Sequence, residues 1–147
     1  VSRVKREGFA VKLDTNGSHP GMIQELMEKR LVDYVAMDVK TEPSLYPRFI
    51  RKDVNPEDIR SSIERIMAAG IAYEFRTTCV RPFVDAETVE AIGRLIQGCS
   101  LYVLQPFRRT RVLDPAFFEN TTAGYDQEEM IGLKAVADPW VQKCIVR

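Results

Sequence analysis

Polar side chains that could bind a small molecule stand near the ends of four short apolar runs in this sequence. They are Asp14, Asp38, Lys40, Arg76 and Gln105. Two carboxylates that lie close together either share a proton or need a cation. Lysine and arginine supply donors that suit a carboxylate, a ribose or a phosphate. These residue types predict a site for a polar, partly anionic small molecule.

The turn signal that begins at Asp14 adds backbone groups to this set. Thr15 and Asn16 follow the carboxylate with short polar side chains, and Gly17 closes the turn. The sequence Asp-Thr-Asn-Gly is also a common kind of turn, so alone it is weak evidence for a site.

Each charged residue also has a purely structural interpretation. Asp38 and Lys40 could form a local ion pair, and Arg76 could simply neutralise Glu74 or Asp38. The placement of these residues on one expected face of a sheet favours a binding site over these separate explanations.

The elements that would position these residues alternate along the chain. We expect strands at residues 9–14, 31–40, 71–80, 101–106 and 140–146, and helices at 20–30, 56–69, 86–97 and 126–137. The sequence between 107 and 125 is irregular and rich in Asp, Pro and Asn. Strands that alternate with helices of this length indicate βαβ units and a parallel sheet. The pattern shows no boundary within residues 1–147, so we expect part of a single domain.

Alternate residues in the expected strands differ in polarity. In residues 9–14, Phe9, Val11 and Leu13 share one face, whereas Lys12 and Asp14 share the other. Burying isolated charges is costly unless they are paired or bind something. The pattern therefore predicts a curved sheet with helices outside and a polar inner face, as in a partial (βα) barrel whose site lies at the C-terminal strand ends. An open sheet with one wet face is the alternative, and it fits poorly with parallel connections.

Composition excludes several classes of function. The 147 residues hold 21 Lys and Arg against 21 Asp and Glu, which gives no reason to expect nucleic acid or a membrane surface as a partner. No apolar run reaches membrane-spanning length and no signal peptide opens the chain, so we expect a cytoplasmic protein. The dispersed Cys79, Cys99 and Cys144 indicate reduced thiols rather than a metal knuckle, and the lone His19 receives no role.

Four segments, in this order, resemble the radical S-adenosylmethionine (SAM) activating proteins of glycyl radical enzymes. They are residues 12–18 (KLDTNGS), 31–40 (LVDYVAMDVK), 73–78 (YEFRTT) and 102–108 (YVLQPFR). The likeness is strongest to the anaerobic ribonucleoside-triphosphate reductase activating protein, and pyruvate formate-lyase activating enzyme is a more distant relative. The resemblance runs from residue 8 to the C-terminus, and its specificity lies in the ordered set.

The resemblance implies an α/β fold, a partial (βα) TIM-type barrel of the radical SAM kind. This chain would hold the last four barrel strands with their outer helices, then a C-terminal helix and strand. The Cys-x3-Cys-x2-Cys loop and the Gly-Gly-Glu strand of the family are absent, and both normally precede the Asp-Thr-Asn-Gly turn. Residues 1–8 are typical of a helix end. We therefore expect a C-terminal fragment that lacks the cluster-binding segment and has no iron–sulfur ligands of its own.

The resemblance also implies roles for the site residues. Aspartates that match Asp14 and Asp38, with the main chain near Thr15 and Ala36, surround a monovalent cation near the SAM carboxylate in the family. Positions that match Lys40 and Arg76 lie near SAM, and the turn that starts at Gln105 flanks the adenine. The implied SAM-binding set is Asp14, Thr15, Asn16, Asp38, Lys40, Arg76 and Gln105.

The implied activity is that of an oxidoreductase. The intact protein would reductively cleave SAM at a [4Fe–4S] cluster, and the 5′-deoxyadenosyl radical would abstract hydrogen from a glycine of a partner such as anaerobic ribonucleotide reductase or pyruvate formate-lyase. A flavodoxin or ferredoxin would supply the electron. This chain alone should be inactive, and its exposed edge at residues 9–14 should favour self-association.

Two alternatives remain open at the level of sequence. An aldolase-like or phosphate-binding barrel would use Lys40 as a nucleophile or acid–base group, which borohydride trapping would detect. A catalytically dead scaffold would only dock a partner enzyme. A Cys-x3-Cys-x2-Cys motif upstream would favour the radical enzyme over the scaffold.

Overall fold

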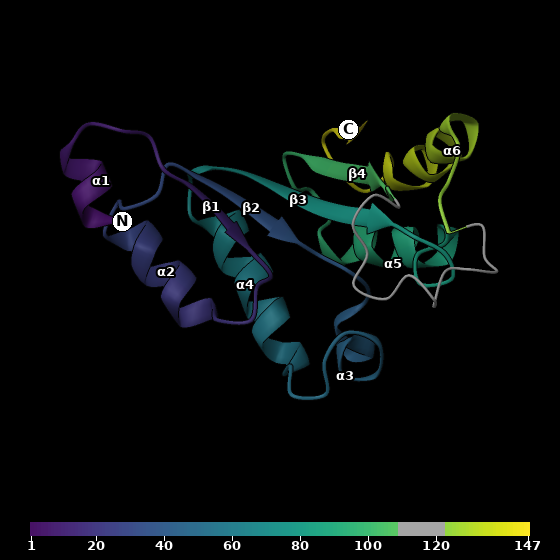
Figure 1. Ribbon diagram of the computed structural model, residues 1–147, viewed down its shortest axis with the longest axis horizontal. Helices are drawn as coiled ribbons and strands as arrows, with labels where there is room; N and C mark the ends of the chain where they lie inside the picture. Colours follow the sequence, from purple (N-terminus) through teal and green to yellow (C-terminus); the bar gives the residue numbers. More distant parts are fainter. Residues whose placement is uncertain (109–122) are drawn as a thin grey trace. The chain divides into compact units, whose positions relative to one another are not determined.

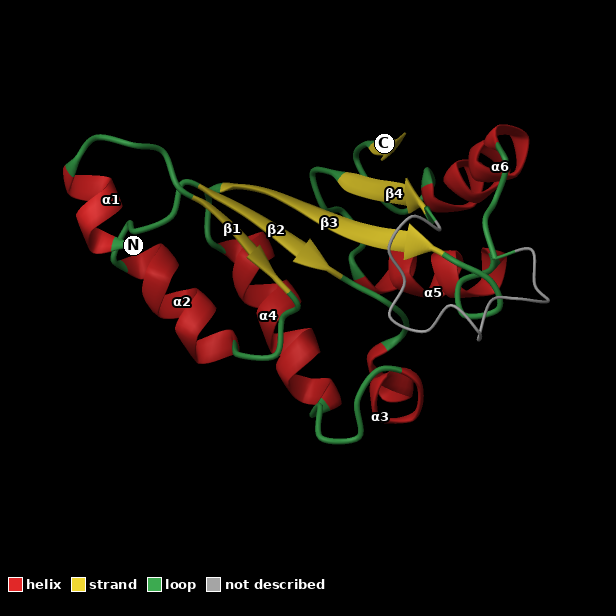
Figure 2. Cartoon of the chain, in the orientation of Figure 1, coloured by secondary structure: helices red, strands yellow, loops and turns green. Residues whose placement is uncertain are grey.

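The computed structural model describes residues 1–108 and 123–147 and shows an α/β fold built on a parallel sheet (Figures 1 and 2). The strands follow the order β1-β2-β3-β4-β5 across the sheet and comprise Lys12–Thr15, Tyr34–Asp38, Ala72–Cys79, Tyr102–Pro106 and Cys144–Val146. The α-helices are α1 (Ser2–Arg6), α2 (Pro20–Glu28), α3 (Tyr46–Phe49), α4 (Pro56–Ala68), α5 (Ala86–Leu95) and α6 (Gln127–Ala137), and a 3₁₀ turn covers Pro43–Leu45.

This fold class agrees with the sequence prediction. A strand or helix occurs in each expected place, and the four strands β1 to β4 are followed by α6 and β5 as the C-terminal helix and strand. The last strand, expected over 140–146, is limited to Cys144–Val146. Two short helices between residues 43 and 49 lie in a segment where the sequence analysis expected no helix. The irregular stretch expected between 107 and 125 falls largely on residues 109–122, which lie outside the described residues.

The first strand is shorter than expected. Residues 9–11 precede β1, whose pairing with β2 begins at Lys12 opposite Tyr34. Phe9 therefore lies before the paired region and is 64% exposed, so its predicted place on the packed face was wrong. The apolar run extended beyond the residues that β2 can pair with.

The chain divides into two compact units. The first comprises Val1–Val39 with Pro43–Phe75, and the second comprises Lys40–Glu42 with Arg76–Arg147. The expectation of a single domain over residues 1–147 stays a prediction.

In the first unit, helix ends follow from local sequence. Asn55 caps α4 by accepting a hydrogen bond from the Glu57 N–H at 3.1 Å, and Pro56 occupies the first helical position. Gly70, at φ +68°, supplies the left-handed residue just after the helix. The buried side chains of α2 and α4 are Ile23, Met27, Ile59, Ser62, Ile63 and Ile66. The two helices pack on each other beside β1 and β2 (Figure 1).

In the second unit, aspartates begin both long helices. Asp85 accepts from the Thr88 N–H at 2.8 Å, and Asp126 forms a reciprocal capping box with Glu129. Arg81, two residues after β3, links this part of the chain to the start of α6. Its guanidinium bonds Glu129 at 2.6 Å and lies 3.9 Å from the ring centre of Tyr125. These contacts fix the chain where it enters α6.

The Gly93→Ala variant tests the packing of α5. A Cβ atom at Gly93 would lie 2.8 Å from Cδ1 of Trp140, so overpacking should lower the free energy of unfolding by about 1–3 kcal/mol. Gly132→Ala is the matched control, because nothing lies within 4 Å of its added Cβ on α6, and it should stabilise the chain by about 1 kcal/mol. Urea denaturation measures both values, and equal effects of the two substitutions would contradict the packing.

Candidate functional site

The turn between β1 and α2 is held together by its own short side chains. The Thr15 hydroxyl accepts a hydrogen bond from the Gly17 N–H at 3.1 Å. The Asn16 amide oxygen accepts from the N–H of Ser18 at 3.0 Å and from its hydroxyl at 2.8 Å. Since both side chains bond within the turn, they shape its backbone, and Gly17 at φ +78° completes the reversal.

The floor beneath this turn is buried and tightly packed. Met37 on β2 is fully buried, and a Cβ atom at Gly17 would come within 2.1 Å of its terminal methyl carbon. From α4, the fully buried Ser62 donates its hydroxyl proton to the carbonyl oxygen of Gly17 at 2.7 Å. The turn is therefore fixed from inside the first unit as well as by its own residues.

Two carboxylates extend from the neighbouring strands at this end of the first unit. Asp14 pairs in register with Ala36, so Asp38 lies two residues farther along the same face of the sheet. With ordinary strand spacings, their Cα atoms are about 8 Å apart. Asp14 is exposed and Asp38 is half-buried. This donor set, with the backbone of the turn beside it, suits a cation or the polar groups of a small ligand.

The other expected site residues belong to the second unit. Arg76 on β3 and Gln105 on β4 are half-buried, whereas Lys40, just beyond β2, is exposed. Lys40, Arg76, Asp14 and Asp38 each take part in at least one polar, ring or electrostatic interaction within the protein. The assembly of all seven expected residues into one site stays a prediction.

The sequence did not identify Glu74 as a buried carboxylate. It is 1% exposed on β3, where Tyr34 donates its hydroxyl proton at 3.1 Å and the Lys12 ammonium donates at 3.3 Å. The same ammonium lies 5.4 Å from the ring centre of Tyr34. These three residues link the consecutive strands β1, β2 and β3. Lys12 stands two residues before Asp14, and Glu74 stands two residues before Arg76. The signal was the shared strand parity of Lys12 and Glu74 with those site residues.

The three cysteines have the properties of core residues. Burial raises the pKa of Cys79 and of Cys99 to about 12 and that of Cys144 to about 11. Metal ligation requires thiolates, which burial disfavours at these positions. Within residues 1–108 and 123–147, no cluster of three Cys, His, Asp or Glu residues could hold a metal ion. These residues do not fit an iron–sulfur cluster.

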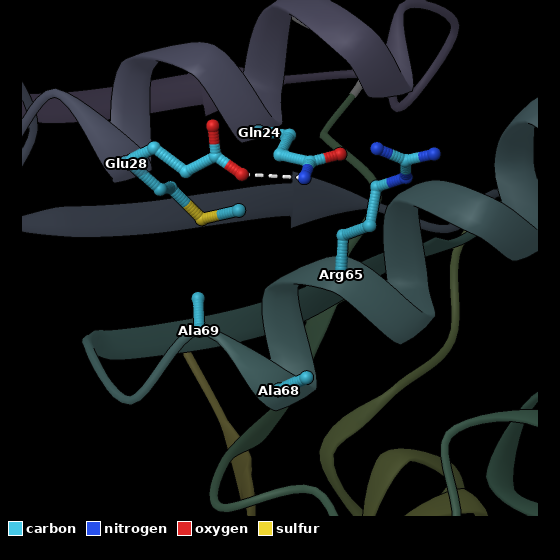
Figure 3. A pocket seen from close by; sticks show the side chains of 6 residues that line it. Gln24, Glu28, Arg65, Ala68 and Ala69 are labelled. Carbon is cyan, nitrogen blue, oxygen red and sulfur yellow. Dashed lines mark hydrogen bonds between the residues drawn. The ribbon is translucent and has the colours of Figure 1, made fainter.

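A groove lies elsewhere in the first unit, between α2 and α4 (Figure 3). Its volume is about 290 Å³, and its lining residues are Gln24, Met27, Glu28, Arg65, Ala68 and Ala69. Gln24 donates to Glu28 at 2.5 Å on its α2 side, and Arg65 stands on its α4 side. None of the expected site residues lines it. In the part of the chain that the structure covers, no helix has the length and apolarity to cross a membrane.

Comparison with known proteins gives one relative in sequence and one in structure. The chain is 33% identical, over 97% of its length, to a provisionally assigned glycyl-radical enzyme activating enzyme of Methanocaldococcus jannaschii. It spans about 60% of that relative. The crystal structure of a domain of pyruvate-formate lyase-activating enzyme from Bacteroides vulgatus superposes with a TM-score of 0.75 and 16% identity, covering 99% of this chain and 85% of the other. No family model matches.

The two relatives support different conclusions. The sequence relative confirms the predicted resemblance to activating proteins of glycyl radical enzymes. The solved domain, at its low identity, confirms the α/β fold.

Raising the pH should destabilise the chain through its buried thiols. Their folded pKa values of about 11 to 12 exceed the ordinary 9.0, so the unfolded chain loses protons that the folded chain keeps. Thiol-linked stability is therefore present below pH 9 and is lost as the pH rises above 9. Urea midpoints measured at pH 8 and pH 10 should fall with pH, and less steeply after Cys99→Ala.

Thiol labelling gives an independent check of this burial. With Ellman's reagent at pH 8, all three cysteines should react slowly in the native chain and rapidly in denaturant. A fast-reacting native cysteine would contradict the assignment to the core.

Proposed function

We propose that this chain is the C-terminal part of a radical SAM activating enzyme, which generates a glycyl radical on a partner enzyme. The observation that carries the proposal is the 33% identity, over 97% of the chain, with the relative assigned as a glycyl-radical enzyme activating enzyme. The carboxylates and the turn at the ends of β1 and β2 support it, because the radical SAM resemblance expects SAM there.

In this proposal the chain binds and orients SAM. Asp14 and Asp38 hold a monovalent cation beside the SAM carboxylate, and the backbone from Thr15 to Asn16 supplies further polar groups. A [4Fe–4S] cluster carried by another segment of the intact protein supplies the electron that cleaves SAM. This chain contributes binding and charge, and the cluster contributes the radical chemistry.

The second unit contributes the remaining SAM-binding groups in this proposal. Lys40 and Arg76 neutralise anionic groups of SAM, and Gln105 lies on the adenine side.

The proposal extends to partners and location. The partner is a glycyl radical enzyme such as anaerobic ribonucleotide reductase or pyruvate formate-lyase, and the electron donor is a flavodoxin or ferredoxin. The free cysteines of the described residues suit the reducing cytoplasm. The isolated chain is inactive because its described residues hold no set of cluster ligands.

SAM cleavage by the full-length protein tests the proposal. After anaerobic reconstitution with iron and sulfide and reduction with dithionite, the protein should convert SAM to 5′-deoxyadenosine and methionine, as chromatography would show. Asp14→Asn should raise the dissociation constant for SAM about tenfold, which corresponds to about 1.4 kcal/mol. Asp53→Asn is the matched control, because the Asp53 carboxylate bonds Arg51 in an exposed loop. This substitution should leave the dissociation constant for SAM unchanged.

Two results would contradict the proposal. One is a full-length protein that binds neither a cluster nor SAM. The other is SAM cleavage by residues 1–147 alone, because these residues would then hold the cluster.

Association of the isolated chain is a separate expectation. β1 stands at one end of the strand order, so its outer edge can pair with another chain. Sedimentation velocity at rising concentration should show a growing share of dimers or larger species. A clean monomer at high concentration would contradict pairing through this edge.

A further inference from the structure

We propose that Ser62 on α4 is a positioning residue for the turn that follows β1, and through that turn for the Asp14 carboxylate. Ser62 lies outside the segments that carry the family resemblance. The inference deepens the proposed function, because it names a residue on which SAM binding depends although that residue does not touch SAM.

The surroundings of Ser62 require a hydrogen-bond partner. It lies among Ile59, Ile63 and Ile66 on the buried face of α4 and is 0% exposed. A buried serine hydroxyl in a helix often bonds the carbonyl oxygen one turn earlier. Here it instead donates to the carbonyl oxygen of Gly17, 45 residues away in sequence, at 2.7 Å. The bond therefore joins an outer helix to the turn after β1.

The hydrogen bond from Ser62 holds the turn at Gly17, the residue where the chain reverses. Gly17 receives the Ser62 bond at its carbonyl oxygen and donates its own N–H to the Thr15 hydroxyl. Residues with a side chain rarely adopt the Gly17 φ of +78°. The Met37 side chain also fills the space that a Cβ atom at Gly17 would need. Removing the hydroxyl leaves a buried carbonyl without this donor, which the turn can relieve only by shifting toward water. Such a shift moves the backbone next to Asp14.

Amide hydrogen exchange tests this inference without SAM. In the full-length protein, Ser62→Ala should speed exchange of the Gly17 and Ser18 amides at least tenfold, because both amides donate within the turn. Ser61→Ala is the matched control, since its hydroxyl accepts a hydrogen bond from Arg65 on the same helix at 2.9 Å and does not reach the turn. Ser62→Thr keeps the hydroxyl and should exchange as the wild type does.

SAM binding gives the second measurement. Titration of the reconstituted full-length protein with SAM, in sodium chloride and in potassium chloride, should show a dissociation constant about tenfold higher for Ser62→Ala and unchanged for Ser61→Ala. The difference between the two salts should also shrink in Ser62→Ala, because a displaced turn no longer holds the cation beside Asp14. A general loss of stability would leave this salt dependence as it is.

The outcomes separate this inference from the proposed function. Equal exchange and equal SAM affinity in Ser62→Ala and Ser61→Ala would overturn the role of Ser62. A wild-type protein that fails to bind SAM would overturn the proposed function, while the exchange measurement would still decide whether Ser62 positions the turn. If Ser62→Ala does not fold, Ser62→Cys replaces it with a weaker donor: faster exchange supports the role, and wild-type exchange overturns it.

Discussion

The buried carboxylate of Glu74 imposes the strongest constraint on the first unit. A carboxylate that is 1% exposed is stable only with hydrogen-bond donors and a nearby cation. Tyr34 on β2 and Lys12 on β1 supply these. The contact therefore ties the short edge strand β1 to the long strand β3 across β2, which four paired residues of β1 alone would do weakly.

The candidate site depends on that edge strand. Lys12 and Asp14 lie on the same face of β1, two residues apart, so the residue that neutralises Glu74 also anchors the start of the site. Beyond Asp14, the turn is fixed from below by Met37 and by the hydrogen bond from Ser62. Polar contacts thus support the exposed carboxylate from both the sheet and the outer helix, and such support keeps a binding group in one geometry.

In the second unit, the buried core residues and the residues expected to bind SAM are different side chains. Its cysteines, with the buried Tyr102 among them, form part of an interior whose thiols stay protonated, as their raised pKa values show. The polar residues expected to bind SAM are half-buried: Arg76 lies three residues from Cys79 on β3, and Gln105 lies three residues from Tyr102 on β4. An odd separation in a regular strand places two side chains on opposite faces. In the proposed function, this chain contributes binding and charge neutralisation.

The sequence by itself determined the elements and their order, because those signals are local. Asn55, Asp85 and Asp126 mark helix starts, because each accepts a hydrogen bond from a residue two or three positions ahead. Gly70, at a positive φ, follows the end of α4. The alternation of polarity along the strands placed Asp14 on the polar face in the same way.

Only the tertiary structure decided which polar residues are buried and what they bond. Glu74 lies 62 residues from Lys12, and Ser62 lies 45 residues from Gly17, so no local pattern in the sequence shows that either pair meets. The length of β1 was likewise set by where β2 pairs with it, which left Phe9 exposed. The free energy of such long-range contacts depends on which segments the fold brings together, and no window of neighbouring residues contains that information.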